Sequence, residues 1–99
     1  MTQRGRTLVL PARLDAAAGR RLACDLRAAI GAPLDVDAGG VDIVSGLSLE
    51  VLLAAALQWR RDGQAFGITA VSGPFRRACD TLAIDAQTLG AVPAAGAQA

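Results

Sequence analysis

The feature that most constrains the fold is an alternation of short apolar runs with longer segments of helical periodicity. Apolar runs begin at Thr7, Leu34 and Ala65, and each precedes a segment whose apolar residues are spaced three and four apart. This alternation predicts an α/β fold, a small mixed or mainly parallel sheet of about four strands with helices packed against it. The 99 residues have room for one core. We expect a single domain over residues 1–90 and a flexible C-terminal tail over 91–99.

The expected elements follow from these patterns and from their end signals. Strands are expected over residues 7–10, 34–38 and 65–71, and helices over 15–30, 48–62 and 73–82. The inner face of the first helix is expected to carry Ala18, Leu22, Leu26, Ala29 and Ile30. The inner face of the third helix, over residues 73–82, is expected to carry Phe75, Ala78, Cys79 and Leu82. Residues 84–89 suit either a short strand or a helical turn.

The segment from Ser48 to Asp62 carries the strongest helical signal. Its main apolar stripe consists of Leu49, Leu52, Leu53, Ala56 and Leu57. Burying three or four leucines at about 1.5–3 kcal/mol each would make this helix central to stability. A second stripe consists of Val51, Ala55 and Trp59. One interpretation is that these three side chains pack against a neighbouring helix. The other is that Trp59 anchors a partner protein.

Groups that perform catalysis or hold metals are scarce. The chain has no His, Lys or Tyr, so no serine has a histidine or lysine base. Cys24 and Cys79 are too few and too far apart for a zinc site, and we interpret them as small buried thiols in preference to a disulfide bridge. Asp35, Asp37 and Asp42 are interpreted as solvated carboxylates in preference to a divalent cation site. We therefore expect neither an enzyme nor a cofactor or metal site.

Charge and hydropathy restrict the partners and the location. The formal net charge is +1, which does not indicate nucleic-acid binding. Met1–Arg6 is polar and does not resemble a signal peptide. The longest apolar run, Val51–Leu57, is much shorter than the ~20 residues that cross a bilayer. We expect a cytoplasmic protein without direct membrane insertion.

Three short pieces of the sequence carry a family likeness. They are Arg13-Leu14-Asp15, the stretch VDAGGVDIVSGLSL from Val36 to Leu49, and Ser72-Gly73-Pro74-Phe75-Arg76-Arg77. In this order and spacing they resemble the STAS domains, whose best-known members are bacterial anti-sigma factor antagonists. The likeness covers roughly Leu8–Leu82.

The second piece departs from the family at the position that is usually phosphorylated. Counted without a gap, Ser45 falls at the family's aspartate and Gly46 at its phosphoserine. Leu47 takes the place of the second serine, and Ser48 that of the glycine. We therefore expect little or no phosphorylation at Ser45 or Ser48 and interpret both as helix N-caps.

The resemblance implies a non-catalytic protein–protein interaction module in bacterial signalling. Its partner would be an anti-sigma factor or a signalling kinase, and a chemotaxis-associated role also fits. The alternative is a regulatory STAS subunit of a lipid-transport ATPase complex, and a third hypothesis is a small-ligand or nucleotide-binding domain. The expected partner-binding residues are Asp37, Gly39, Gly40, Asp42, Ser45, Gly46, Leu47, Ser48, Val51 and Trp59.

Overall fold

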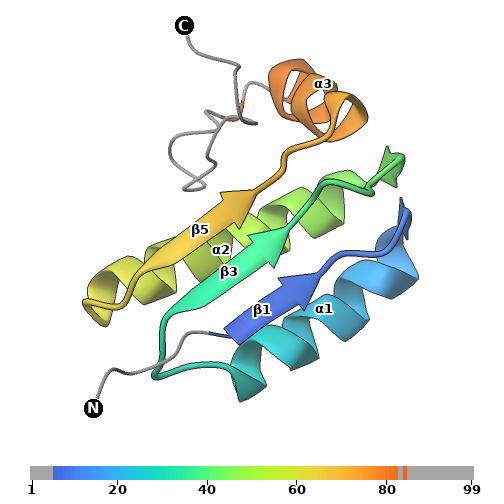
Figure 1. Ribbon diagram of the computed structural model, residues 1–99. Coiled ribbons are helices and arrows are strands. Elements are labelled where there is room, and N and C mark those ends of the chain that lie inside the picture. Colours follow the sequence, from blue (N-terminus) through green and yellow to red (C-terminus); the bar gives the residue numbers. More distant parts are fainter. Residues whose placement is uncertain (1–5, 83, 85–99) are drawn as a thin grey trace, which may run out of the picture.

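The computed structural model describes residues 6–82 and residue 84 (Figure 1). Its elements in chain order are β1 (Arg6–Val9), β2 (Arg13–Leu14), α1 (Ala16–Ala28), β3 (Leu34–Asp37), β4 (Ile43–Val44), α2 (Gly46–Arg61), β5 (Phe66–Thr69) and α3 (Gly73–Thr81). The predicted α/β class is confirmed. The predictions for residues 85–89 and for the tail lie outside the described residues.

The described strands form two separate parallel sheets. The larger sheet has the order β1-β3-β5, and β2 pairs with β4 in a ladder of two residues each. The prediction of a single sheet of about four strands therefore gives way to three strands and a small ladder beside them. Pro11 lies in the link between β1 and β2.

The helices α1 and α2 cover one face of the larger sheet, and α3 lies beyond its end (Figure 1). The covered face carries Leu8, Leu34, Val36, Phe66 and Ile68. The other face carries Thr7, Val9, Asp35, Asp37, Gly67 and Thr69, and Val9 is 67% exposed. The carboxyl ends of the strands and the starts of α1 and α2 therefore meet at one end of the molecule.

The core face of α2 differs from the predicted main stripe. Leu49, Leu52 and Ala56 are buried as expected, but Leu57 is 41% exposed. Ala55 and Trp59 of the second stripe are buried against the flank where α1 packs. The buried arc is thus centred between the two stripes, because α2 contacts both the sheet and α1.

The ends of α1 and α3 explain why two residues that were predicted to lie in the core, Ile30 and Leu82, are exposed. Ile30 is 50% exposed because α1 ends at Ala28, so the helical spacing no longer directs its side chain to the core. Leu82 is 48% exposed because it lies just past the end of α3. Asp15 and Ser72 are the N-caps of α1 and α3, and their side chains accept hydrogen bonds from the N–H groups of Ala18 and Phe75.

Candidate functional site

The loop after β3 is held by hydrogen bonds from both sides. The Asp37 carboxylate accepts the Gly39 N–H at 2.8 Å, which closes a tight turn. The Ala38 N–H donates to the Thr69 carbonyl at 3.0 Å, and the Ser72 N–H donates to the Ala38 carbonyl at 3.3 Å. The loop is therefore fixed to the end of β5 and to the start of α3.

Two adjacent glycines in this loop have different surroundings. A Cβ added at Gly39 would lie 3.0 Å from both the Cβ and the carbonyl oxygen of Ala70, whereas a Cβ at Gly40 would meet nothing within 4 Å. Gly39 is thus needed for a close approach of two loops. Gly40 presents exposed backbone at the surface.

The segment that leads into α2 is clamped between β2 and α3. The Ser72 hydroxyl donates to the Val41 carbonyl at 2.7 Å. On the other side, the Ser45 N–H donates to the Leu14 carbonyl at 2.9 Å and the Ile43 N–H to the Ala12 carbonyl at 3.0 Å. The backbone that presents Asp42–Leu47 is therefore preorganised.

Three large apolar side chains stand exposed around the start of α2. Ile43 of β4 is 50% exposed, Leu47 in the first turn of α2 is 40% exposed, and Leu82 after α3 is 48% exposed. The Leu82 Cδ1 would lie 3.7 Å from a Cβ at Gly46, which joins the end of α3 to the start of α2. We call Ile43, Gly46, Leu47 and Leu82 the docking face.

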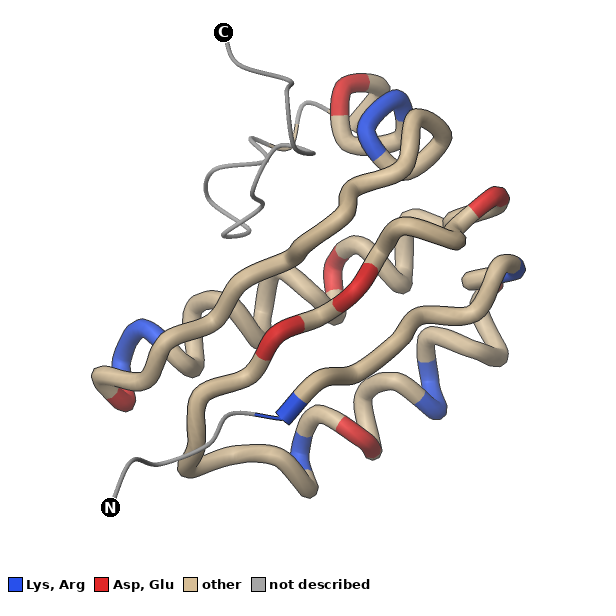
Figure 2. Tube along the Cα trace, viewed as in Figure 1, with Lys and Arg blue, Asp and Glu red and all other residues tan. Residues whose placement is uncertain are grey.

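Charged side chains border the docking face. Arg13 of β2 is the register partner of Ile43, and both are exposed. Asp42 precedes Ile43 and is also exposed. Figure 2 shows further charges of both signs on α3. An apolar centre with a charged rim is the usual composition of a protein-binding surface.

Ser45 and Ser48 have structural roles. The Ser45 Oγ accepts the Ser48 N–H at 3.1 Å, so Ser45 is the N-cap, and α2 begins at Gly46, two residues before the predicted start. Ser48 is fully buried, and its hydroxyl lies within hydrogen-bond distance of the Leu14 and Asp15 carbonyls, at 3.2 and 3.1 Å. The interpretation of Ser48 as a cap and as a contact residue is therefore wrong.

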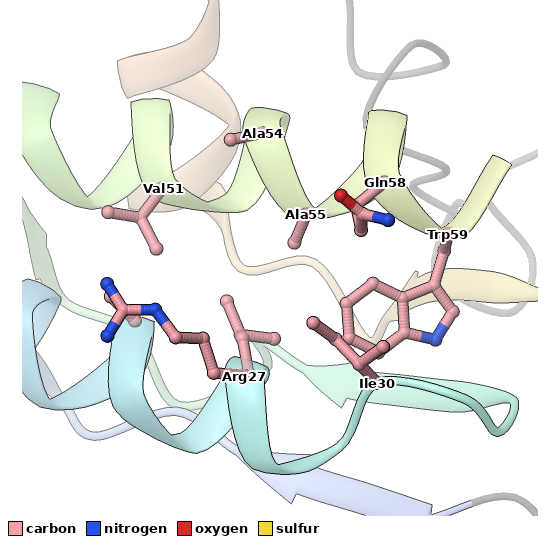
Figure 3. Close-up of a pocket in the computed structure, with 9 residues that line it drawn as sticks. Arg27, Ile30, Val51, Ala54, Ala55, Gln58 and Trp59 are labelled. Carbon is pink, nitrogen blue, oxygen red and sulfur yellow. The ribbon is translucent and has the colours of Figure 1, made fainter. Parts of the chain in front are cut away.

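Val51 and Trp59 lie away from the docking face. Trp59 is 2% exposed, its Nε1–H donates to the Ala32 carbonyl at 2.8 Å, and its ring centroid lies 5.5 Å from that of Phe66. Trp59 is thus part of the core, as the packing interpretation expected, and not a surface anchor. Both residues line an open groove of about 260 Å³ between α1 and α2 (Figure 3).

The remaining residues predicted to bind a partner lie together at the carboxyl end of the sheet. They are Asp37, Gly39, Gly40, Asp42, Ser45, Gly46 and Leu47. Ile43 and Leu82 were missed: Ile43 was not among the expected partner-binding residues, and Leu82 was expected on a core face. An apolar residue one position past a helix end was the available signal for Leu82.

The titratable groups offer little for catalysis. Cys79 is buried, as predicted, whereas Cys24 is exposed, and both are free thiols. Burial, with a contribution from the Asp80 carboxylate, raises the pKa of the Cys79 thiol, which disfavours the nucleophilic thiolate. Among the described residues there is no group of three His, Cys, Asp or Glu side chains placed to hold a metal ion.

No protein-family model matches the chain, and no curated protein or solved structure matches it. Across residues 6–82 and 84, no helix is both long and apolar enough to cross a membrane. The candidate site is therefore defined by the geometry of the docking face alone.

Proposed function

We propose that the chain is a non-catalytic, STAS-like interaction module that binds a protein partner through its docking face. The observation that carries the proposal is that Ile43 of β4, Leu47 in the first turn of α2 and Leu82 after α3 are all 40–50% exposed, and that Leu82 lies against Gly46 at the start of α2. Covering a large apolar side chain fully yields about 1.5–3 kcal/mol, so covering three half-exposed ones supplies a substantial share of a micromolar affinity.

The rigidity of the surrounding backbone supports the same proposal. The segment from Val41 to Ser45 is hydrogen-bonded to β2 on one side and to Ser72 on the other. A surface that is already ordered loses little conformational entropy when it binds. The lack of His, Lys and Tyr argues for recognition over catalysis at this surface.

The resemblance to STAS domains suggests the class of partner. We place the module in the cytoplasm of a bacterium, with an anti-sigma factor or a signalling kinase as its partner. The modest net charge of +1 gives no support for nucleic acid as a partner. If the protein recovered with the chain is a transporter ATPase and not a kinase-type protein, the alternative function, a regulatory subunit of a lipid-transport ATPase complex, is supported.

Photo-crosslinking tests the position of the contact directly. A photoreactive phenylalanine derivative replaces Leu47 in one variant and Leu57 in another, because these residues share α2 and are 40% and 41% exposed. We expect a defined crosslinked protein, identified by mass spectrometry, from position 47 and not from position 57. Equal crosslinking from both positions, or crosslinking from position 57 alone, would overturn the proposal.

A further inference from the structure

The groove between α1 and α2 is an apolar surface that lies apart from the docking face. It is lined from both helices, and its lining includes Ala23, Ile30, Val51, Ala54 and Trp59. Ile30 is 50% exposed, and Ala54 is exposed as well. In Figure 3 Ile30 and the Trp59 ring lie together at one end of the groove, and Val51 lies at the other. None of the docking-face residues lines this groove, so the molecule presents a second apolar surface.

The dimensions of the groove match about two turns of a helix. Its walls extend from Ala23 to Ile30 on α1 and from Val51 to Trp59 on α2, which at 1.5 Å per residue is about 10–12 Å. Its volume of about 260 Å³ lies below the ~300–1,000 Å³ of the cavities that enclose small ligands. A bound helix needs cover on one face alone, so an open groove of this size favours a helix over a small molecule.

A cationic side chain borders this apolar surface. Arg27 is the charged residue among those that line the groove, and in Figure 3 it extends toward the end at Val51. Within the described part of the chain the Arg27 guanidinium has no ion pair. Arg20, seven residues earlier, lies on the same side of α1 and is also exposed. The α1 side of the groove is therefore cationic.

A protein segment that covers the groove removes water from the Arg27 guanidinium. A charged group that leaves water without a partner raises the free energy of the complex, whereas a carboxylate supplies charge-assisted hydrogen bonds in place of water. A basic segment would instead bring like charges together. The segment that fits is therefore apolar where it enters the groove and carries a carboxylate at its border.

We propose that the groove binds an amphipathic helix of a partner protein, one whose apolar stripe is bordered by glutamate or aspartate. The stripe, with apolar residues three and four apart, enters between α1 and α2 and covers Ile30 and Val51. A carboxylate beside the stripe pairs with the Arg27 guanidinium, and a second one, two turns along the helix, reaches Arg20. This site is additional to the docking face, since it leaves Leu47 free.

Two synthetic helical peptides test the charge preference. Each has about 18 residues, or five turns, with leucines spaced three and four apart; one carries glutamate beside this stripe and the other carries lysine. Fluorescence anisotropy of the fluorescein-labelled peptides gives their dissociation constants for the full chain. We expect the glutamate peptide to bind at least about tenfold more tightly, because the lysine peptide faces Arg27 with a like charge.

A charge reversal on α1 assigns this preference to one side chain. Arg27→Glu is expected to reverse the order of the two peptides, whereas Arg21→Glu is expected to keep it. Arg21 is the matched control, because it is exposed on α1 and does not line the groove. Equal affinity of the two peptides for the wild-type chain, no binding of either, or an unchanged order in Arg27→Glu would overturn the proposal.

A substitution in the groove wall tests the position of the peptide. Ala54→Gln places a longer polar side chain in the groove, so the affinity for the glutamate peptide should fall about tenfold or more. Because Ala54 is exposed, the unfolding temperature should stay the same. Ala17→Gln, exposed on α1 outside the groove, should leave the affinity unchanged. Leu47→Asp should do so too, which distinguishes a failure of this site from a failure of the docking face.

Peptide affinity that survives Ala54→Gln, or that is lost in Leu47→Asp, would contradict the proposal. Sedimentation equilibrium tests a second copy of the chain as the occupant. A wild-type dimer that Ala54→Gln dissociates would assign the groove to this second copy and not to a partner helix.

Discussion

Leu47 and Leu57 lie on the same helix and are exposed to the same degree, 40% and 41%, but their surroundings differ. Leu47 follows Gly46, beside which Leu82 lies at the end of α3, and β4 with the exposed Ile43 directly precedes this start of α2. Leu57 belongs to the C-terminal half of α2, where the neighbouring side chains of Ala55, Ala56 and Trp59 are buried against the sheet and α1. The exposure of a single leucine therefore says little, whereas the convergence of three elements on one patch marks a candidate for binding.

The two halves of α2 also differ in what buries them. The C-terminal half is fixed by the large Trp59 ring, which touches Phe66 and donates to Ala32. The N-terminal half buries Leu49 and Leu52 and adds a small polar contact, the Ser48 hydroxyl against the carbonyls before α1. Substitutions in the two halves should accordingly change stability by different amounts and through different mechanisms.

The largest expected effect is the loss of stability in Trp59→Ala. Removing a buried tryptophan leaves a cavity and an unpaired Ala32 carbonyl, so we expect the free energy of unfolding to fall by about 3–5 kcal/mol. Urea unfolding followed by circular dichroism measures it. Leu57→Ala, the control on the same half of α2, should cost about 1 kcal/mol or less. A small loss in Trp59→Ala would contradict the assignment of this ring to the core.

A double-mutant cycle tests the polar contact in the other half. A Cβ at Gly19 would lie 2.6 Å from the Ser48 Oγ, so Gly19→Ala should destabilise the wild-type chain despite the better helix propensity of alanine. In the Ser48→Ala background that oxygen is gone, and the nearest Ser48 atoms lie 3.4 and 3.5 Å away.

We therefore expect Gly19→Ala to be neutral or stabilising in the Ser48→Ala background. Ser48→Ala by itself should cost about 0.5–1.5 kcal/mol, because one buried hydroxyl hydrogen bond is lost while the Leu14 and Asp15 carbonyls keep the backbone N–H donors of Ser45 and Gly19. The same urea titrations give all four corners of the cycle. Additive effects of the two substitutions would show that Gly19 and Ser48 do not meet.

Alkaline pH should weaken the region beneath the docking face through Cys79. The pKa of this thiol is raised in the folded state, so folding favours the neutral form. Its contribution is complete below the ordinary thiol pKa of about 8.5 and is lost as the pH rises above it. The chain has no Lys or Tyr to obscure the effect.

Thermal unfolding between pH 7.5 and pH 10 measures this dependence. The decline should persist in Cys24→Ala, whose thiol is exposed, and should flatten in Cys79→Ala. An equal decline in Cys79→Ala would assign the effect to another group.

The smallest expected effect is the absence of phosphorylation at the start of α2. The Ser48 hydroxyl is fully buried, and the Ser45 hydroxyl is occupied as the N-cap. Incubation with a co-encoded kinase and ATP should leave the intact mass unchanged. A phosphate on either serine would refute this and would restore the switch that the STAS resemblance implies. Ser45→Ala and Ser48→Ala would locate the modified residue.

Much of the fold could be predicted because local signals suffice for it. Asp15, Ser72 and Pro74 mark the starts of two helices. The alternation of short apolar runs with helical segments indicates that the strands are parallel. The exact core face of α2 could not be predicted, because the position of α1 decides that Trp59 is buried and Leu57 is not. That position is a property of the tertiary structure.

The candidate site was predictable in place but not in composition. The loop after β3 and the start of α2 were identified from Gly39, Gly40 and the two serines. The contribution of Leu82 could not be foreseen, because it depends on the end of α3 packing beside Gly46. The role of Ser48 was likewise hidden, since its partners lie 33 and 34 residues away in the sequence.

The most direct test of the docking face is the affinity of the crosslinked partner for two charge variants. Isothermal titration calorimetry would compare Leu47→Asp with Leu57→Asp, which add the same charge to the same helix at equal exposure. We predict that Leu47→Asp raises the dissociation constant by about tenfold or more, while Leu57→Asp changes it by less than about twofold. Equal effects of the two variants, or wild-type affinity in Leu47→Asp, would contradict the proposed docking face.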